Sequence, residues 1–409
     1  MHFSKSGDGH AVDNLVPWVF LDWLLFLIIA LDSATRFAVE HTWCASWGID
    51  SPTAIDAVIL WVNGSDPAWV EQRKAAEAVH LPPGGLPARY VAQRFTAHDE
   101  LQWLVRSIDR FAPWVRTIHL VVDHQLPSWL AKAPEGAKTG STQSKDPWSK
   151  YYAGKQIARG NTHNTHWEEE VLSGRQLCCT EGGIPIRVHT HSELIRWGYH
   201  SYNSAAIQMH LHNIRGLSRR WILVDDDQLL LRSTAPSDFF GADGEPLLAP
   251  GNPSGEIRVE RCDNFDTGLI WWFGISRSYE LVLEHTRREN LRWVLPSHVP
   301  IAVDTLQWQA MVNTYVQLDE LTASPFRRCG DLQPQALYAL HEAARRGSLE
   351  RAISPATKCE WAENSPGESL ERLRKQMNAG KLPNYCCIQQ YSRELYQELL
   401  PQILGRKGG

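Results

Sequence analysis

The sequence has no excess of positive charge and no internal repeat. Its 409 residues contain 41 Lys and Arg against 46 Asp and Glu, which gives a formal net charge of −5. Proteins that hold nucleic acid through its phosphates need clustered Lys and Arg, so this balance argues against a nucleic-acid partner and against a metal-dependent nuclease. A hydrophobic content of 43% with 21% charged residues is ordinary for a globular protein and excludes wholesale disorder.

Cysteine pairs of the CxxC type are also absent, which argues against a structural zinc site. The eight cysteines are an even number, but they are too sparse in a chain of this length to define a disulfide framework. Their pairing and the redox compartment stay open at this point.

The chain has no unbroken apolar run long enough to span a bilayer. Residues 16–30 are apolar except for Asp22, but they fall short of the roughly 20 residues that a membrane-spanning helix needs. A signal-anchor, an uncleaved signal peptide and a buried or interfacial helix are the three alternatives. We expect an accessory segment at residues 1–50, with membrane association through residues 16–30.

Apolar runs and helical spacing predict an α/β fold with a twisted, mostly parallel sheet and helices on both faces. The run Ile55–Val62 predicts a buried strand, the spacing over Asp99–Phe111 an amphipathic helix, and Val115–Val122 a second buried strand. Strand, helix and strand in this order are typical of parallel sheets. Further predicted elements are strands at Ile184–Val188, Trp221–Val224 and Ile270–Ile275 and a helix at Ser204–Leu217.

The composition divides the remainder of the chain. Residues 51–345 form the predicted main domain, and residues 134–183 within it are polar and rich in Gly, Ser, Thr and Asn, which is typical of an insertion or a long surface loop. Residues 346–409 read as a helical extension that packs as a lid or brace.

The sharpest chemical signal is the run WILVDDD, in which a buried strand ends in three carboxylates. Hard cations such as Mg²⁺ and Mn²⁺ prefer oxygen ligands, and parallel strands deliver ligand-binding groups at their carboxyl ends. Three adjacent acids also repel one another unless a cation lies among them. We therefore expect Asp226 and Asp227 to bind a metal ion, with a solvated acidic turn as the alternative.

Three further motifs are weak when each is taken alone. Asn63-Gly64 ends a predicted strand in a tight turn whose N–H groups suit a phosphate, although such turns are common. His298 before Val-Pro is more often a packing histidine. Arg327, four residues before Asp331, has the guanidinium that binds phosphate bidentately, although a surface ion pair is the more frequent outcome.

The order of these motifs resembles the Stealth family of sugar-phosphate transferases. That family includes bacterial capsule phosphotransferases and the catalytic subunit of the lysosomal-enzyme N-acetylglucosamine-1-phosphotransferase. Its first block is similar to IDVVYTWVDGSDP, and residues 55–67 read IDAVILWVNGSDP. Its second block contains APWVR and then GQIPSWL, and residues 99–130 read DELQWLVRSIDRFAPWVRTIHLVVDHQLPSWL.

Two later blocks complete the resemblance. Residues 201–227 read SYNSAAIQMHLHNIRGLSRRWILVDDD, where the family has a Phe-Asn-Ser segment, a helix, GLS and an Asp-Asp strand end. A family His-Met-Pro turn and a later Arg are matched by His298-Val299-Pro300 and Arg327. The chain departs from the pattern at Gln208, where the family usually has Glu, at Val299 in place of Met, and at Asp225, where Asn is common.

The resemblance implies a nucleotide-sugar-transferase-like fold and the transfer of a sugar-1-phosphate from a nucleotide-sugar to a hydroxyl of a glycan or glycoprotein acceptor. A nucleoside monophosphate leaves. Carried over residue by residue, the resemblance implies that Asp226 and Asp227 bind Mg²⁺ or Mn²⁺. It implies three catalytic residues: His298 as base, Arg327 on the transferred phosphate, and Glu100 as a second acid/base or metal group. The nucleotide pocket would be formed by Asn63, Gly64 and Asp66.

Two other functions remain open from the sequence. A metal-dependent glycosyltransferase would use the same acidic strand end but release a nucleoside diphosphate. A non-catalytic sugar-binding Stealth domain is the second alternative, and Gln208 is the feature that favours it. The polar insertion and the possible anchor favour the Golgi membrane or the secretory pathway, with a bacterial cytoplasmic capsule enzyme as the alternative.

Overall fold

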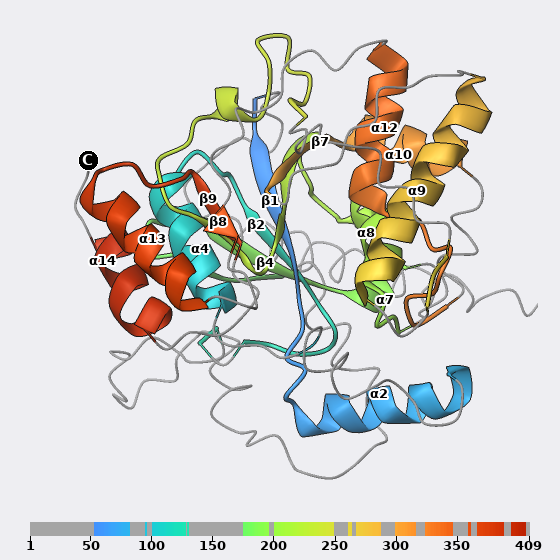
Figure 1. The fold of residues 1–409 in the computed structure, drawn as a ribbon, viewed down its shortest axis with the longest axis horizontal. Coiled ribbons are helices and arrows are strands. Elements are labelled where there is room, and N and C mark those ends of the chain that lie inside the picture. The colour runs from blue at the N-terminus through green and yellow to red at the C-terminus, as the bar shows by residue number, and fades with distance from the viewer. Residues whose placement is uncertain are drawn as a thin grey trace, which may run out of the picture. The chain divides into compact units, whose positions relative to one another are not determined.

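A six-stranded sheet lies at the centre of the computed structural model, in the order β3-β4-β2-β1-β5-β7 (Figure 1). The strands are β1 (Ile55–Trp61), β2 (Ile118–Val122), β3 (Arg175–Cys179), β4 (Pro185–Thr190), β5 (Arg220–Asp225) and β7 (Ile301–Asp304). β1 pairs in parallel with β2 and β5, and β2 pairs in parallel with β4. The outer strands β3 and β7 are antiparallel to their neighbours. The carboxyl ends of the four parallel strands, β1, β2, β4 and β5, therefore lie at the same side of the sheet, which we call the carboxyl edge.

The structure describes most of the chain after its first 52 residues. The described residues are 53–81, 95, 100–127, 129–130, 175–195, 200–248, 261–263, 267–287, 299–315, 324–346, 359–360, 366–387 and 394–405. They belong to a compact unit of residues 49–409. Among them, no helix has the length and apolar character to cross a bilayer. The predicted membrane-associated residues 16–30 lie outside the described residues.

Helices cover both faces of the sheet, as the sequence predicted. Figure 1 shows α4, α13 and α14 on one face and α7 to α12 on the other. Alternating side chains of β1 explain the two layers, because Ile59 packs with Leu104 of α4 whereas Val58 packs with Ile207 of α8. The helices are α2 (Pro67–His80), α4 (Glu100–Phe111), α7 (His191–Leu194), α8 (Ser204–Met209), α9 (Thr267–Thr286), α10 (Thr305–Thr314), α12 (Pro334–Arg346), α13 (Pro366–Asn378) and α14 (Leu400–Gly405).

The C-terminal part is not purely helical. It supplies β8 (Cys359–Glu360) and β9 (Tyr385–Cys387), which form a second sheet with β6 (Gln228–Leu230) in the order β6-β9-β8. A π-helical turn at Leu395–Leu399 precedes α14. Leu370 and Leu395 are buried in the same core as the α4 face of the central sheet.

Three local predictions need correction. The segment Ile270–Ile275 is not a strand but part of α9, because a six-residue apolar run does not by itself distinguish a buried strand from a buried helix. The predicted helix Ser204–Leu217 ends at Met209 and continues as a 3₁₀ turn at Leu211–Asn213. The polar insertion ends in β3, which forms an edge of the central sheet.

A buried polar network lies at the start of β1. Asp56 accepts two hydrogen bonds from the Arg116 guanidinium, at 2.8 and 2.6 Å, and one from the backbone N–H of Ser218 at 2.6 Å. His119 lies 3.2 Å from Asp56 and 2.9 Å from His189. Burial alone would raise the pKa of Asp56, but the partners His119 and Arg116 outweigh it and lower this pKa to about 2. Asp56 is therefore a charged carboxylate whose charge is compensated inside the protein.

We expect Asp56→Asn to lower the free energy of unfolding at pH 7 by about 3 kcal/mol, because Arg116 would keep a buried charge without its partner. The pKa of Asp56 in the folded protein lies below its value in the unfolded chain. The stabilisation that depends on this difference, roughly 2 kcal/mol, is therefore complete above pH about 4 and is lost as the pH falls towards 2.

Urea unfolding followed by tryptophan fluorescence at pH 7 and at pH 3 measures both effects. Glu71→Gln, on the exposed side of α2, is the control and should change stability little. Equal stability of Asp56→Asn and the wild-type protein at pH 7 would contradict the proposed role of the network.

Candidate functional site at the carboxyl edge

The direction of winding of the sheet changes between the neighbouring strands β1 and β5. The chain runs from β1 to β2 and β4 on one side and then crosses to β5 on the other side of β1. The α4 helix packs on one face of the sheet and α8 on the opposite face. Open α/β sheets bind ligands where the direction of winding changes in this way, beyond the carboxyl ends of the strands. The loops that follow β1 and β5 flank this position.

The turn after β1 is held in place by backbone contacts. The side chain of Gln125 accepts from the Asn63 N–H at 2.8 Å and donates to the Asn63 carbonyl at 3.0 Å. Gly64 lies so close to the backbone of Phe95 that a Cβ atom would be 1.8 Å from its carbonyl oxygen. Asp66 caps α2 by accepting from the Trp69 N–H at 3.0 Å. Asp66 thus caps α2, and its place in the nucleotide pocket stays a prediction, as do those of Asn63 and Gly64 at the carboxyl edge.

An acidic cluster follows β5. Asp225 pairs with Leu60 of β1 in register and is held by Gln228 and Gln335, whose side-chain amides each donate to it at 3.2 Å. The thiol of Cys387 donates to Asp227 at 3.1 Å. The second sheet therefore supports the acidic loop from the C-terminal part of the chain.

The structure brings Glu100 to this cluster. Helices that connect parallel strands run antiparallel to them, so the first residue of α4 lies at the carboxyl edge. Desolvation raises the pKa of Asp226 well above its ordinary value, and the negative charges of Asp227, Glu100 and Asp225 raise it further. Four carboxylates that oppose one another's ionisation make a set of oxygen donors that suits a hard divalent cation.

The side chain of Arg327 contacts the first residue of α8. Its guanidinium donates to the Ser204 hydroxyl at 2.6 Å. Asn203, the N-cap of α8, donates from its side chain to Asp331 at 2.9 Å. The segment around Arg327 and the start of α8 are therefore in direct contact, which their order along the sequence did not reveal. Gln208 is buried on the same short helix.

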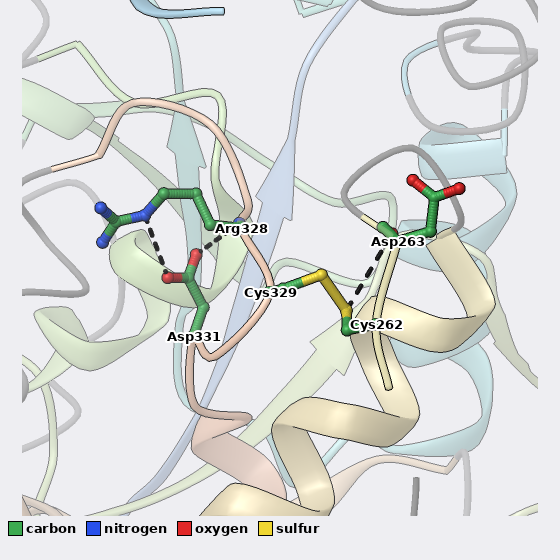
Figure 2. The surroundings of a disulfide bond; sticks show 5 residues. All are labelled: Cys262, Asp263, Arg328, Cys329 and Asp331. Atoms are coloured by element: carbon green, nitrogen blue, oxygen red, sulfur yellow. Dashed lines mark hydrogen bonds and ion pairs between the residues drawn. A yellow bond between two sulfur atoms is a disulfide. The ribbon is translucent and has the colours of Figure 1, made fainter. Parts of the chain in front are cut away.

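A disulfide and an aromatic stack fix the Arg327 loop. Cys262 is bonded to Cys329, and Figure 2 shows this bond next to the ion pair of Arg328 and Asp331. The ring of Phe326 stacks on Tyr202 at 5.0 Å. The sequence left the cysteine pairing open because partners 67 residues apart carry no local signal.

A polar group at the end of β2 was not predicted from the sequence. Asp123 is buried and accepts from the indole N–H of Trp69 at 2.7 Å. His200 lies 3.1 Å from the other Asp123 oxygen, and His191, after β4, lies 3.8 Å from it. Burial alone would raise the pKa of Asp123, but His200 and His191 lower it to about 2. Its position directly after a buried strand, like that of Asp226, was the available signal.

His298 lies outside the described residues, so its role as a base stays a prediction. The neighbouring Val299 is buried immediately before β7. The described site therefore contains the predicted residues Asn63, Gly64, Asp226 and Asp227 at strand ends. Glu100 joins the acidic cluster, and Arg327 lies at the start of α8.

Comparison with known proteins finds the family that the residues resemble. Residues 53–78 match the Stealth protein CR1, conserved region 1. An exopolysaccharide phosphotransferase of Streptomyces coelicolor is 27% identical over 387 residues, which cover 91% of this chain and 57% of the relative. The capsular polysaccharide phosphotransferase LcbA of Aeromonas hydrophila is 30% identical over 198 residues, which cover 48% of this chain and 40% of the relative.

A solved structure of the apo-form glycosyltransferase GlyE of Streptococcus pneumoniae matches 86% of this chain and 61% of its own length, with 8% identity and a TM-score of 0.34. A likeness this distant carries no argument about function. The chain spans less than two thirds of the length of the two phosphotransferases. The conserved-region match and these phosphotransferase relatives confirm the resemblance drawn from the residues: the chain is similar to Stealth-family phosphotransferases.

Proposed function

We propose that this chain transfers a sugar-1-phosphate from a nucleotide-sugar to a hydroxyl of a glycan acceptor. The acceptor oxygen attacks the phosphorus next to the donor sugar, a phosphodiester forms, and a nucleoside monophosphate leaves. The observation that carries the proposal is the cluster of Glu100, Asp226 and Asp227 at the carboxyl edge, where the direction of winding changes between β1 and β5. The names of the relatives, exopolysaccharide and capsular polysaccharide phosphotransferases, support the same reaction class.

Phosphoryl transfer requires mainly positioning and the neutralisation of negative charge. A divalent cation such as Mg²⁺ or Mn²⁺ would neutralise charge on the donor diphosphate when bound. Asp226 and Asp227 would hold it, with Glu100 as a further oxygen ligand or as an acid/base group. The raised pKa of Asp226 supports this role, because a nearby positive charge is what would restore its ionised form.

Arg327 would bind the transferred phosphate. Its contact with Ser204 at the start of α8 orients the guanidinium without removing its charge, and the Cys262–Cys329 disulfide restricts its loop. Asn63 and Gly64 would shape the nucleotide pocket, since their turn is close enough to the backbone of Phe95 to exclude any side chain at position 64. His298 remains the proposed base for the acceptor hydroxyl.

The relatives described above are bacterial. They support the bacterial capsule or exopolysaccharide setting, which was the alternative drawn from the sequence, and they give no support to a Golgi address. We propose a polysaccharide as the acceptor class and make no assignment of donor base or sugar.

The reaction is tested with a panel of nucleotide-sugars, sugar or oligosaccharide acceptors and Mg²⁺ or Mn²⁺. We expect acceptor-dependent release of a nucleoside monophosphate, with the donor's phosphorus recovered in a phosphodiester by ³¹P NMR. Release of a nucleoside diphosphate would contradict sugar-phosphate transfer and indicate a glycosyltransferase.

Asp226→Asn should lower turnover by about 100-fold or more, because a metal-binding charge is lost. The same change removes repulsion within the acidic cluster. In metal-free buffer the variant should therefore be at least as stable as the wild-type protein, which separates lost activity from lost folding. Metal-dependent rates and thermal unfolding measure the two effects. Asp243→Asn, in an exposed turn, is the control; an unchanged metal dependence of Asp226→Asn would refute the assignment.

Arg327→Lys should lower kcat by about 10- to 100-fold, because lysine keeps the charge but loses the planar fork that binds phosphate bidentately. Initial rates of monophosphate release at saturating donor measure this. Arg277→Lys on the exposed face of α9 is the matched control, since Arg277 pairs only with Glu280 among the interactions found in the described residues. If both variants turn over at the wild-type rate, Arg327 does not act on the phosphate.

A further inference from the structure

A second group of metal-ligand side chains lies at the carboxyl edge. One ligand atom each from Asp123, His124 and His200 falls within 4.8 Å of the other two. Asp123 and His124 directly follow β2, and His200 belongs to the segment before α8. Residues from two distant parts of the chain therefore converge on one point.

The distances suit a small ion. The Nδ1 atom of His200 lies 3.1 Å from Oδ1 of Asp123, and Nε2 of His124 lies 3.9 Å from the same oxygen. In a tetrahedral site with metal–ligand bonds of about 2.0–2.1 Å, neighbouring ligand atoms are about 3.3 Å apart. The two separations lie on either side of this value, and the ligand atoms of His124 and His200 are within 4.8 Å of each other, so the three atoms lie close to coordinating distances.

The carboxylate is oriented towards the imidazoles. The indole of Trp69 donates to Oδ2 of Asp123 at 2.7 Å, which leaves Oδ1 as the atom nearest His124 and His200. Trp69 is buried and packs edge-on against Tyr202 at 5.4 Å, close in sequence to His200. Such an outer contact is how proteins fix a ligating carboxylate. The buried His191, 3.8 Å from Oδ1, lines the cluster from the end of β4.

The backbone of His124 is a second, independent observation. His124 has φ 53°, in the left-handed region that favours glycine. Glycine adopts this conformation without strain, whereas a residue with a Cβ is strained there by about 1–2 kcal/mol. In this conformation the His124 imidazole lies 3.9 Å from Asp123, and the His200–Asp123 hydrogen bond alone would not require the strained backbone.

The donor set differs from the acidic cluster after β5. Two imidazoles and one carboxylate suit Zn²⁺ and similar transition-metal ions, whereas carboxylates alone suit Mg²⁺ or Mn²⁺. Three protein ligands leave a fourth position for water or a ligand. The side chain of Asp123 is 2% exposed, that of His124 21% and that of His200 47%, so the group is open to solvent on one side.

We propose that Asp123, His124 and His200 bind a Zn²⁺-type ion. This site is separate from the Mg²⁺ or Mn²⁺ position proposed on Asp226 and Asp227. It does not depend on the proposed reaction. The bound ion would join the end of β2 to the segment before α8, next to Gln125, which holds the Asn63 turn.

The test titrates Zn²⁺ into untagged, chelator-treated full-length protein by calorimetry, with Co²⁺ absorption as a spectroscopic probe. We expect one bound ion per chain, a tetrahedral Co²⁺ spectrum displaced by Zn²⁺, and a rise in Tm when Zn²⁺ is added. Millimolar Mg²⁺ should not displace the ion, and Asp226→Asn should still bind Zn²⁺.

Two variants each remove one proposed ligand without leaving a cavity or a strained backbone in the protein. His200→Ala acts at a half-exposed side chain, and His124→Gly introduces a residue suited to the left-handed backbone. Each should bind Zn²⁺ at least about ten-fold more weakly and lose the tetrahedral Co²⁺ spectrum. His80→Ala, at the exposed end of α2, is the control and should bind as the wild type does. Wild-type affinity in both variants, or no saturable binding to the wild-type protein, would overturn the proposal whatever the activity assay gives.

Discussion

The parallel pairing of β1 with β2 and β5 is the constraint on which the rest of the structure depends. Parallel strands end at the same side of a sheet, so residues far apart in the sequence arrive at one edge. Asn63 follows β1, Asp123 follows β2 and Asp226 follows β5. The α4 helix, which must return antiparallel to the strands, adds Glu100 to the same edge. An antiparallel arrangement of these strands would distribute the groups over both sides.

Two carboxylates at the ends of the sheet differ in their surroundings: Asp56 is fully buried, whereas Asp226 is partly exposed. Asp56 at the start of β1 has Arg116, His119 and the backbone N–H of Ser218 around it, and its pKa falls to about 2. Asp226 beyond the end of β5 is surrounded by other acids, and its pKa is raised. A compensated charge stabilises the fold, whereas an uncompensated acidic cluster is where we propose that a cation binds. The same residue type therefore has pKa shifts of opposite direction at opposite ends of the sheet.

Prediction from the sequence succeeded where burial produces a local pattern. The strand β1 and the helix α4 follow from their apolar spacing, and the helix was placed to within one residue. The segment Ile270–Ile275 failed because a short apolar run fits a buried helix as well as a strand. In Ser204–Leu217 the buried residues Ile207, Leu211 and Ile214 keep a spacing that α-helix and 3₁₀ turn share, so the spacing did not reveal where α8 ends.

The sequence by itself determined the α/β class, the acidic end of β5 and the resemblance to the Stealth family, since each depends on neighbouring residues or on the order of motifs. Only the tertiary structure decided which distant groups meet: Glu100 with Asp226, Arg327 with Ser204, and Asp123 with His200. It also decided the Cys262–Cys329 pairing. These contacts join segments that no local spacing relates, because strand order and the side of the sheet on which each helix packs set their positions.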